Sequence, residues 1–564
     1  MQKLAPDIYL LPFLMNYMKH YLAHFQEAVK ANWSGNGLSD YRGEDFTYGD
    51  IAVAIEKIHI LFEQAGIKKG DKVALCARNC ARWGISFLAI NTYETVAVPI
   101  LADFHPDSIN HLVDHSDSVA LFTDGDIWKK LDINAMPQVK NVINVQDFSV
   151  LYSGDGKMQE AYDGLDGTFK KKYPMGYSPE HVSFPTDNDK DLAVINYTSG
   201  TTSAPKGVML KYESFSATVD FAQKEIPADN SMNVVSMLPM AHMYGLDFEF
   251  LYPICSGVHI YFLGKTPSPT LLMRAMKDVR PYMIVTVPLV MEKIYKSAIK
   301  PALSKKGVRF LTHVPVISNF IYKKAGKTLM ETFGGNIGHI IMGGAPLNPE
   351  VEKCFKRMGL PYLVGYGMTE ACPLLAYEKP YKFVFGSCGK AFMYAEVRVD
   401  SEDPQHIAGE IQAKGMNICL GYFKNPEATA NAFTDDGFLR TGDLGIIDAH
   451  GNIFIKGRSK SMILSANGQN IYPEELEAII NSQDYVAESV VVDRASKIVA
   501  LVYLDRDQIK KAGLDEEAIS DIPENVRVNS NRMLPGYSQI TKVEVVLEPF
   551  EKTPKMSIKR FLYK

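Results

Sequence analysis

The sequence predicts an α/β protein with a large N-terminal domain of mainly parallel sheets flanked by helices and a small α+β C-terminal domain. Apolar strands alternate with helical segments through most of the chain, which is typical of parallel sheets covered by helices on both faces. The 564 residues exceed what one hydrophobic core normally serves, so two or more cores are expected. The pattern changes after residue 456, where a compact unit of about 100 residues begins.

The alternation is regular between residues 71 and 124. Strands are expected at DKVALCA (71–77), TVAVPIL (95–101) and SVALFTD (118–124). A helical stretch through Trp83 and Ile90 separates the first two strands. SINHLVDHS (108–116) predicts a helix before the third strand, after a Pro-Asp start. The repeated order of strand and helix predicts a parallel sheet.

The clearest domain boundary lies within IKGRSKSMIL, near residues 456–461. AHGNIFIKG, which precedes it, resembles a tight hairpin, and SANGQN (465–470) predicts a turn after it. A helix is expected from PEELEAIINS (473–482), followed by strands in VAESVVVD, KIVALVYLD and KVEVVLE. We therefore expect a large domain at 1–456 and a small domain at 457–564.

Composition and charge exclude several classes of protein. Hydrophobic residues make up 46% and charged residues 22% of the chain, as in ordinary soluble proteins. The net charge of −5 argues against a protein dedicated to nucleic acid, which would carry a basic face. Seven scattered cysteines fit a reducing cytosol. His111 and His115 have helical spacing but no accompanying Glu, so a zinc pair is not expected.

The N-terminal segment reads as an amphipathic helix. Apolar residues recur there at helical spacing, namely Leu14, Met18, Tyr21, Leu22, Phe25 and Val29. We expect this face to pack on the core, with contact to a membrane surface as the alternative. No apolar run approaches the roughly 20 residues needed to cross a bilayer. The sequence thus predicts a cytoplasmic protein, with peripheral membrane contact left open.

The stretch INYTSGTTSAPKGVML (195–210) has the chemistry of a phosphate-binding loop. An apolar strand runs into a loop of small and hydroxyl-bearing residues that ends at Lys206. Small residues let backbone N–H groups approach an anion, while hydroxyl groups and a lysine add donors and charge. The loop lacks the second Gly and the Ser or Thr after Lys that a Walker A loop has. Ser203 stands near its end, where a small residue is tolerated.

YTSGTTSAPKG (197–207) closely resembles the phosphate loop of adenylate-forming enzymes, a superfamily that includes acyl-CoA synthetases. Further segments resemble those of the same family in the same order: LPMAHMYG (238–245), MGGAPL (342–347), GYGMTE (365–370), GEIQAKGMNICLGYFKNPEAT (409–429), FLRTGDLG (438–445) and IKGRSKSMILSANGQNIYPEELE (455–477). Several independent segments in register identify the chain as a member of this family across roughly 45–564. The resemblance is strongest to long-chain fatty acid–CoA ligases.

The resemblance implies that ATP, Mg²⁺ and coenzyme A are used, and it assigns roles to individual residues. Lys206, His242, Thr369 and Glu370 are implied to be catalytic, with His242 beside the acyl carboxylate and Glu370 and Thr201 near Mg²⁺. Asp443 is implied to accept hydrogen bonds from the ribose hydroxyls. The remaining residues implied in nucleotide or coenzyme A binding are Thr198, Ser199, Gly200, Thr202, Gly344, Ala345, Pro346, Tyr366, Gly367, Met368, Arg458, Lys460 and Gly468.

The family's small domain rotates between adenylation and thioester formation, which implies a mobile C-terminal domain with a hinge near Lys460. The C-terminal tail departs from the family pattern. A lysine normally bridges the substrate carboxylate and the α-phosphate there, and aligning FEKTPKMSIKRFLYK places Ser557 at its position. Lys555 and Lys559 flank Ser557 by two residues each, on one face if the tail is extended. Our hypothesis is that Lys555 or Lys559 substitutes; the alternative is slowed adenylation.

The acid is indicated only by the segment 285–300 and a helical insert to about residue 334, which resemble long-chain ligases. An apolar tunnel between the His242 region and the strand at 338–345 is the expected acyl pocket, partly lined by methionines from 232–243. The expected small-molecule partners are a fatty acid, ATP and coenzyme A, and nucleic acid is not expected. Three alternatives remain: a ligase that loads an acyl carrier protein, a luciferase-like oxygenase, and a non-catalytic acyl or nucleotide sensor.

Overall fold

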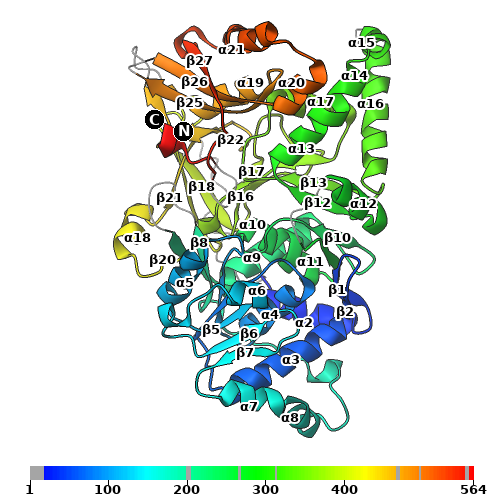
Figure 1. Ribbon diagram of the computed structural model, residues 1–564, viewed down its shortest axis with the longest axis vertical. Helices are drawn as coiled ribbons and strands as arrows, with labels where there is room; N and C mark the ends of the chain where they lie inside the picture. Colours follow the sequence, from blue (N-terminus) through cyan, green and yellow to red (C-terminus); the bar gives the residue numbers. More distant parts are fainter. Residues whose placement is uncertain are drawn as a thin grey trace.

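The computed structural model describes residues 18–198, 205–264, 269–311, 314–464, 470–494, 497–552 and 558–563. Most of the N-terminal part is built on two large sheets with helices between and around them, and the C-terminal unit lies at one end of the molecule (Figure 1). This arrangement confirms the predicted α/β class with largely parallel sheets.

The first sheet has the strand order β20–β9–β8–β4–β3–β5–β6–β7. Its strands are β3 (Lys72–Cys76), β4 (Val96–Pro99), β5 (Ser118–Thr123), β6 (Asn141–Asn144), β7 (Val150–Ser153), β8 (Leu192–Thr198), β9 (Lys206–Lys211) and β20 (Gly421–Tyr422). The central strands from β8 to β6 run parallel, while β7, β9 and β20 are antiparallel to their neighbours. The strands predicted at 71–77, 95–101 and 118–124 are confirmed as β3, β4 and β5, and the helix α5 (Pro106–His115) lies where 108–116 predicts it.

The second sheet has the order β14–β13–β12–β10–β11–β1–β2 and is parallel except where β1 pairs with β2. Its strands are β1 (Asn36–Asp40), β2 (Asp45–Thr47), β10 (Asn233–Ser236), β11 (His259–Phe262), β12 (Met283–Thr286), β13 (His339–Met342) and β14 (Tyr362–Val364). Because parallel strands end at the same edge, the segments that follow β10, β12, β13 and β14 are brought together.

Helices that are buried on all sides fill the main core. In α4 (Ala81–Thr92) and α9 (Tyr212–Glu225), nearly every residue is buried, as is the whole π-helical segment η3 (Leu246–Leu251). The rings of Trp83 and Phe87 stack at 5.8 Å, and both meet Phe250 edge to face. The core cluster joins these side chains to residues of both sheets, so the helices connect one sheet to the other.

The N-terminal helix α2 (Tyr21–Ala31) packs its apolar face into this core. Tyr21, Leu22, Phe25 and Val29 are fully buried, which confirms core packing and leaves these side chains unavailable to a membrane. Leu14 lies outside the described residues. None of the helices within the described ranges has the length and hydropathy that crossing a bilayer requires.

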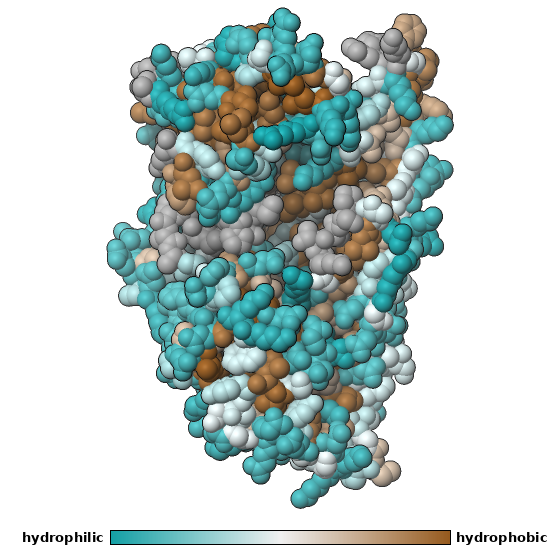
Figure 2. Space-filling view, viewed as in Figure 1, coloured by the Kyte–Doolittle hydropathy of each residue, from teal (hydrophilic) through white to brown (hydrophobic). Residues whose placement is uncertain are grey.

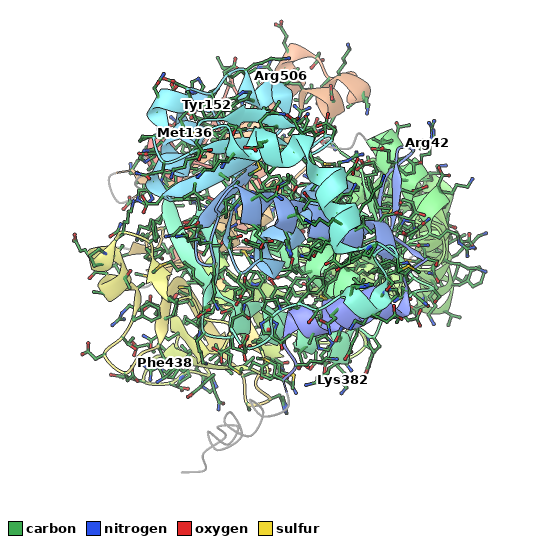
Figure 3. All side chains as sticks on the ribbon, turned by 90° about the horizontal axis from the view of Figure 1, so that it is seen from below. Arg42, Met136, Tyr152, Lys382, Phe438 and Arg506 are labelled. Atoms are coloured by element: carbon green, nitrogen blue, oxygen red, sulfur yellow. The ribbon has the colours of Figure 1, made fainter. Side chains whose placement is uncertain are left out.

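A further antiparallel sheet has the order β18–β19–β21–β22. It lies beside the two large sheets and leads to the C-terminal unit (Figure 1). It is formed by β18 (Ala395–Asp400), β19 (Gly409–Gly415), β21 (Leu439–Ile447) and β22 (Ile453–Arg458). Seen from below, Phe438, next to β21, and Arg42, next to β1, lie on opposite sides of the molecule (Figure 3). The predicted hairpin before residue 457 is confirmed as β21–β22, and a turn at 459–461 follows β22.

The C-terminal unit has its own core of strands β25 (Val486–Arg494), β26 (Lys497–Leu504) and β27 (Lys542–Val546) with helices α19 (Pro473–Asn481), α20 (Arg506–Ala512) and α21 (Glu516–Asn531). It contacts the helical run formed by α13 (Pro288–Ile294), η4 (Tyr295–Ile299) and α14 (Lys300–Leu303). Lys296 Nζ donates to the carbonyl oxygens of Asn481 at 2.8 Å and Val486 at 3.1 Å. Lys300 pairs with Asp484 at 3.0 Å, so these lysines hold the C-terminal unit against the larger part.

Candidate active site

The segment that resembles a phosphate-binding loop connects two directly paired strands. β8 ends at Thr198 and β9 begins at Lys206, and these two residues are partners in the antiparallel register. β8 and β9 therefore form an antiparallel pair next to the edge strand β20. Ser199, Gly200, Thr201 and Thr202 lie outside the described residues.

Lys206, Tyr422 and Glu370 form a continuous series of contacts. The ammonium of Lys206 lies 4.8 Å from the centre of the Tyr422 ring, a cation–π distance. The Tyr422 hydroxyl donates to Glu370 Oε1 at 2.9 Å. Burial and the neighbouring charge of Glu370 raise the pKa of Tyr422, so the hydroxyl keeps its proton and remains a donor. A loop cation and a carboxylate far apart in the sequence are thus joined through one tyrosine.

The three-residue 3₁₀ turn η5 (Thr369–Ala371) carries Thr369 and Glu370, and Met368 caps it. It follows the short strand β15 (Tyr366–Gly367), which pairs with β16 (Leu374–Tyr377). Only glycine fits at position 367, because a Cβ there would approach the Pro373 carbonyl oxygen to 1.8 Å. The tight β15–β16 turn therefore sets the position of Glu370.

Asp443 is held between a tyrosine and an arginine. Its Oδ2 accepts a hydrogen bond from Tyr366 at 2.8 Å, and its Oδ1 lies 3.2 Å from Arg458 Nε. Asp443 and Arg458 are direct partners in the β21–β22 register. Burial raises the pKa of Asp443 above its ordinary value, while the charge of Arg458 opposes that shift. The residues predicted separately from FLRTGDLG and IKGR are therefore one cluster.

The turn after β13 carries Gly344, Ala345 and Pro346, and all three residues are exposed. Gly344 has φ of +83°, a left-handed conformation that glycine adopts without strain. Since β14 runs beside β13 and leads directly to Tyr366, this turn and the Tyr366–Asp443 pair begin at the same edge of the sheet.

Contacts from several elements hold the segment that carries His242. Asn196 on β8 donates to the Ala241 carbonyl at 2.9 Å, and Asn79 donates to the Leu238 carbonyl at 2.6 Å. His242 itself is half-buried and caps the helical run α10–η3–α11 that spans 243–255. These contacts fix the backbone of the segment relative to both sheets.

Glu249, on η3, anchors the start of the same segment. Its Oε2 accepts hydrogen bonds from the backbone N–H groups of Met237 at 2.9 Å and Leu238 at 2.8 Å and from the Ser236 hydroxyl at 3.1 Å. The side chain is completely buried, and burial raises its pKa to about 8. Sequence analysis missed Glu249, because nothing in LDFEFL distinguishes it from a surface acid.

An apolar pocket lies beside this segment. It is lined by Met237, Leu272, Met276, Ile284, Thr286, Val290, Met291, Ile294 and Phe333. Of the methionines in 232–243, Met237 lines this pocket, whereas Met240 and Met243 are buried in the main core. The pocket opens between β12 and helices α12 (Pro269–Val279) and α13, and β13 contributes none of its lining residues. Its volume of about 10 Å³ holds little more than one water-sized sphere.

The C-terminal candidates are only partly described. Lys460 is exposed in the turn after β22, and Gly468, Lys555 and Ser557 lie outside the described residues. Lys559 Nζ donates to Glu551, and Arg560 pairs with Glu477. The 3₁₀ turn η7 (Arg560–Tyr563) begins directly after Lys559, so an extended tail is not continued there.

The structure thus joins Lys206 with Glu370 and Tyr366 with Asp443 and Arg458. Tyr422 was missed as a site residue, although it lies within the quoted segment GEIQAKGMNICLGYFKNPEAT. Its position in that segment was the available signal.

Comparisons with known proteins match most of the chain. A family model described as AMP-binding enzyme matches residues 25–423, and one described as AMP-binding enzyme C-terminal domain matches 460–563. Long-chain-fatty-acid–CoA ligase 1 of Saccharomyces cerevisiae is 27% identical over 92% of this chain and 80% of that protein. 4-coumarate–CoA ligase 3 of Oryza sativa subsp. japonica is 26% identical over 83% and 81%. The Bacillus subtilis O-succinylbenzoate coenzyme A synthetase (MenE), solved with ATP and magnesium ion, has a TM-score of 0.72 at 19% identity, covering 96% of this chain and 98% of that one, which supports the fold.

We predict that replacing Glu249 changes stability in a way that depends on pH. Its raised pKa means that the folded protein keeps a proton that the unfolded chain loses near pH 4.3. The contribution of Glu249 to the free energy of unfolding therefore falls as pH rises towards about 8. Glu249→Gln keeps an acceptor and removes the titration, so its denaturant midpoint should approach or exceed that of the parent at pH 8. Glu249→Leu leaves two backbone N–H groups unpaired and should cost about 2–4 kcal/mol. Equal midpoints for Gln and Leu at every pH would contradict this role.

Proposed function

The chain belongs to the AMP-binding enzyme family, and from this we propose that it is an ATP-dependent acid–thiol ligase acting on a long-chain fatty acid. The fatty acid becomes an acyl-adenylate, and the acyl group is then transferred to coenzyme A with release of AMP. The series Lys206–Tyr422–Glu370 is the observation that carries the proposal, because it joins the phosphate loop to a carboxylate suited to a phosphate-bound cation.

In the first step, a carboxylate oxygen of the acid attacks the α-phosphorus of ATP. A new O–P bond forms, and the bond to pyrophosphate breaks. Because both reactants are anions, catalysis rests on positioning and on cations that stabilise charge at phosphorus. Lys206, together with the hydroxyls of Thr198, Thr201 and Thr202, would contact the phosphates. His242 would lie beside the acyl carboxylate.

The residues present fit Mg²⁺. Glu370 uses Oε1 to accept the Tyr422 hydrogen bond, which leaves its second oxygen for a cation. Mg²⁺ is commonly held by one or two carboxylates together with substrate phosphates and water. Within the described ranges no cluster of three or more His, Cys, Asp or Glu side chains forms a metal cage, and a phosphate-bound Mg²⁺ does not require one. When bound, the ion would neutralise phosphate charge.

Asp443 would orient the nucleotide through its ribose. Two carboxylate oxygens that already contact Tyr366 and Arg458 each retain a lone pair for a ribose hydroxyl. The charge of Arg458 opposes the rise in the pKa of Asp443 that burial causes. Gly344, Ala345 and Pro346 would flank the adenine, as would the backbone from Tyr366 to Thr369.

In the second step, the coenzyme A sulfur attacks the acyl carbonyl carbon, and the bond to AMP breaks. We propose that the small domain, from residue 457, rotates about Lys460 between the steps and brings Gly468 towards the site. Supporting this, Lys460 is exposed in a turn between two separately packed units. A hinge needs only such a few residues at the end of an element.

A long-chain acid is supported by the name of the yeast relative, and the pocket beside Met237 supports only an apolar character of the acid. The rice relative is named for an aromatic acid, so the acid itself has to be measured. An acyl carrier protein is the alternative acceptor, and a non-catalytic sensor is the alternative that Ser557 would favour. The seven cysteines are free, which fits the proposed cytoplasmic location.

We predict that AMP release requires both a long acid and coenzyme A. The measurement is AMP formed from ATP with acids from acetate to stearate, with and without coenzyme A. Acyl-AMP that forms on the protein but is not consumed when coenzyme A is added would indicate a carrier protein as acceptor. Tight ATP binding without turnover on any acid would contradict the ligase proposal and favour the sensor.

Tyr422→Phe should slow adenylation by about 10- to 100-fold, since it removes a hydrogen bond to a charged group. The ring remains over Lys206, so the change isolates the contact to Glu370. We expect the Mg²⁺ concentration for half-maximal rate to rise, measured by pyrophosphate exchange. Tyr381→Phe, at an exposed position, is the control. An unchanged Mg²⁺ dependence would show that Tyr422 does not position Glu370.

The substitution hypothesis for the C-terminus is tested by Lys555→Ala and Lys559→Ala. One of these two lysines is expected to take the role of the lysine missing at Ser557. Its replacement by alanine should lower the adenylation rate by at least about 10-fold, as expected for loss of a charge-stabilising group. Acyl transfer from preformed acyl-AMP should be unaffected. Lys542→Ala, on the same domain, is the control. If neither variant slows adenylation, the substitution idea fails.

A further inference from the structure

The helical hairpin formed by α15 (Lys306–Leu311) and α16 (Pro315–Thr332) exposes large apolar side chains at its tip. Phe310, Val316 and Phe320 are 76%, 80% and 69% exposed, and Leu311, Val314 and Ile317 are also exposed. Figure 1 shows the hairpin protruding at the upper right, and Figure 2 shows hydrophobic side chains gathered at that corner. A soluble protein rarely leaves such a contiguous apolar patch without a partner.

One face of α16 is already occupied by packing. Arg357, on α17 (Pro349–Met358), lies 3.7 Å from the centre of the Tyr322 ring and donates to Ser318. A Cβ at Gly326 would approach the Met358 carbonyl oxygen to 2.3 Å, so the two helices are in close contact. The exposed stripe lies on another face, with Val316 and Phe320 nearest the tip. α16 is therefore packed against α17 along one face, and its apolar tip belongs to a helix that is held in place.

The same hairpin is basic. From residue 306 to residue 332 the sequence has five Lys and Arg residues and one acidic residue, Glu331, in a chain whose net charge is −5. Lys323, Lys324 and Lys327 are exposed and continue the stripe of Val316 and Phe320 at helical spacing. Seven residues separate Phe320 from Lys327, about 10 Å along a helix. Apolar side chains thus lie at the tip and cations one to two turns behind them.

We propose that this tip inserts into the surface of an anionic lipid bilayer. Interfacial helices bury apolar side chains about 5–10 Å deep while their lysines meet the lipid phosphates, a spacing that this stripe matches. A second copy of the chain is disfavoured, because a two-fold contact would place the same basic residues against each other. The bilayer also accepts a convex protrusion, which a protein partner would have to match with a groove.

The hairpin leads directly to the apolar pocket. Phe333, which follows the last residue of α16, is one of the pocket's lining residues. Val316 and Phe333 lie at opposite ends of α16, about 25 Å apart along the helix, so a tip in the bilayer would hold the pocket at about that distance from a membrane-dissolved acid. Vesicle binding is independent of turnover, so the proposal stands or falls separately from the proposed reaction.

Co-sedimentation of the full chain with phosphatidylcholine vesicles, with and without phosphatidylglycerol, tests the proposal. The parent protein should bind the anionic vesicles and be released by salt. Lys323→Gln/Lys324→Gln/Lys327→Gln should weaken partitioning on the order of 100-fold, at about fivefold per lysine. Phe310→Ser/Phe320→Ser should weaken it at least about 10-fold. The matched controls are Lys129→Gln/Lys130→Gln/Lys171→Gln and Met175→Ser, at exposed positions elsewhere.

Thermal melts check that each variant remains folded. Parent protein that stays in the supernatant at low salt would overturn the proposal, as would a control that loses as much binding as the hairpin variants. Hairpin variants that keep full vesicle binding but change the size of the protein in gel filtration would also overturn it, since the tip would then contact a second copy or another protein.

Discussion

Hydrogen bonds from the buried polar side chains of α9 are the constraint on which the site depends. Thr218 donates to the carbonyl oxygen of Cys372 at 2.5 Å, in the turn that follows Glu370. Ser214 donates to the carbonyl oxygen of Met416 at 3.1 Å, on the segment that leads to β20. Because β9, which begins at Lys206, runs directly into α9, this helix links Lys206 to the elements that carry Glu370 and Tyr422. A buried donor left without a partner costs about 1–3 kcal/mol, so these contacts favour a single arrangement.

The elements of the fold were predictable because their signals are local. Apolar runs such as 71–77 and 118–124 are short, end at turn residues and are buried on both faces, so the strand pattern alone locates them. α9 gave no comparable signal. Its Glu213, Ser214 and Asp220 suggest a solvated face, yet Glu213 is buried and paired with Lys211, the N-cap residue of α9, and with Lys190 on a separate segment. Such burial depends on partners that no local pattern identifies.

The site was predictable to a different degree in each part. The Asp443–Arg458 pair follows from a hairpin register, and both residues stand in recognisable segments. Tyr422 reaches Glu370 only because β20 adds to the edge of β9, a long-range pairing invisible in the sequence. The same limit applies to Glu249, whose importance comes from the backbone groups that it meets after folding.

The helical run 288–303 connects parts that would otherwise be independent. Val290 and Ile294 line the apolar pocket, and Lys296 on the same run donates to the carbonyl oxygens at the end of α19 and the start of β25. The run passes through a π-helical segment, a geometry often found at functional sites. A pocket of about 10 Å³ cannot hold an acyl chain unless its walls move. Val290 and Ile294 belong to the same helical run as Lys296, so a movement of this wall would also move the contact to the C-terminal unit.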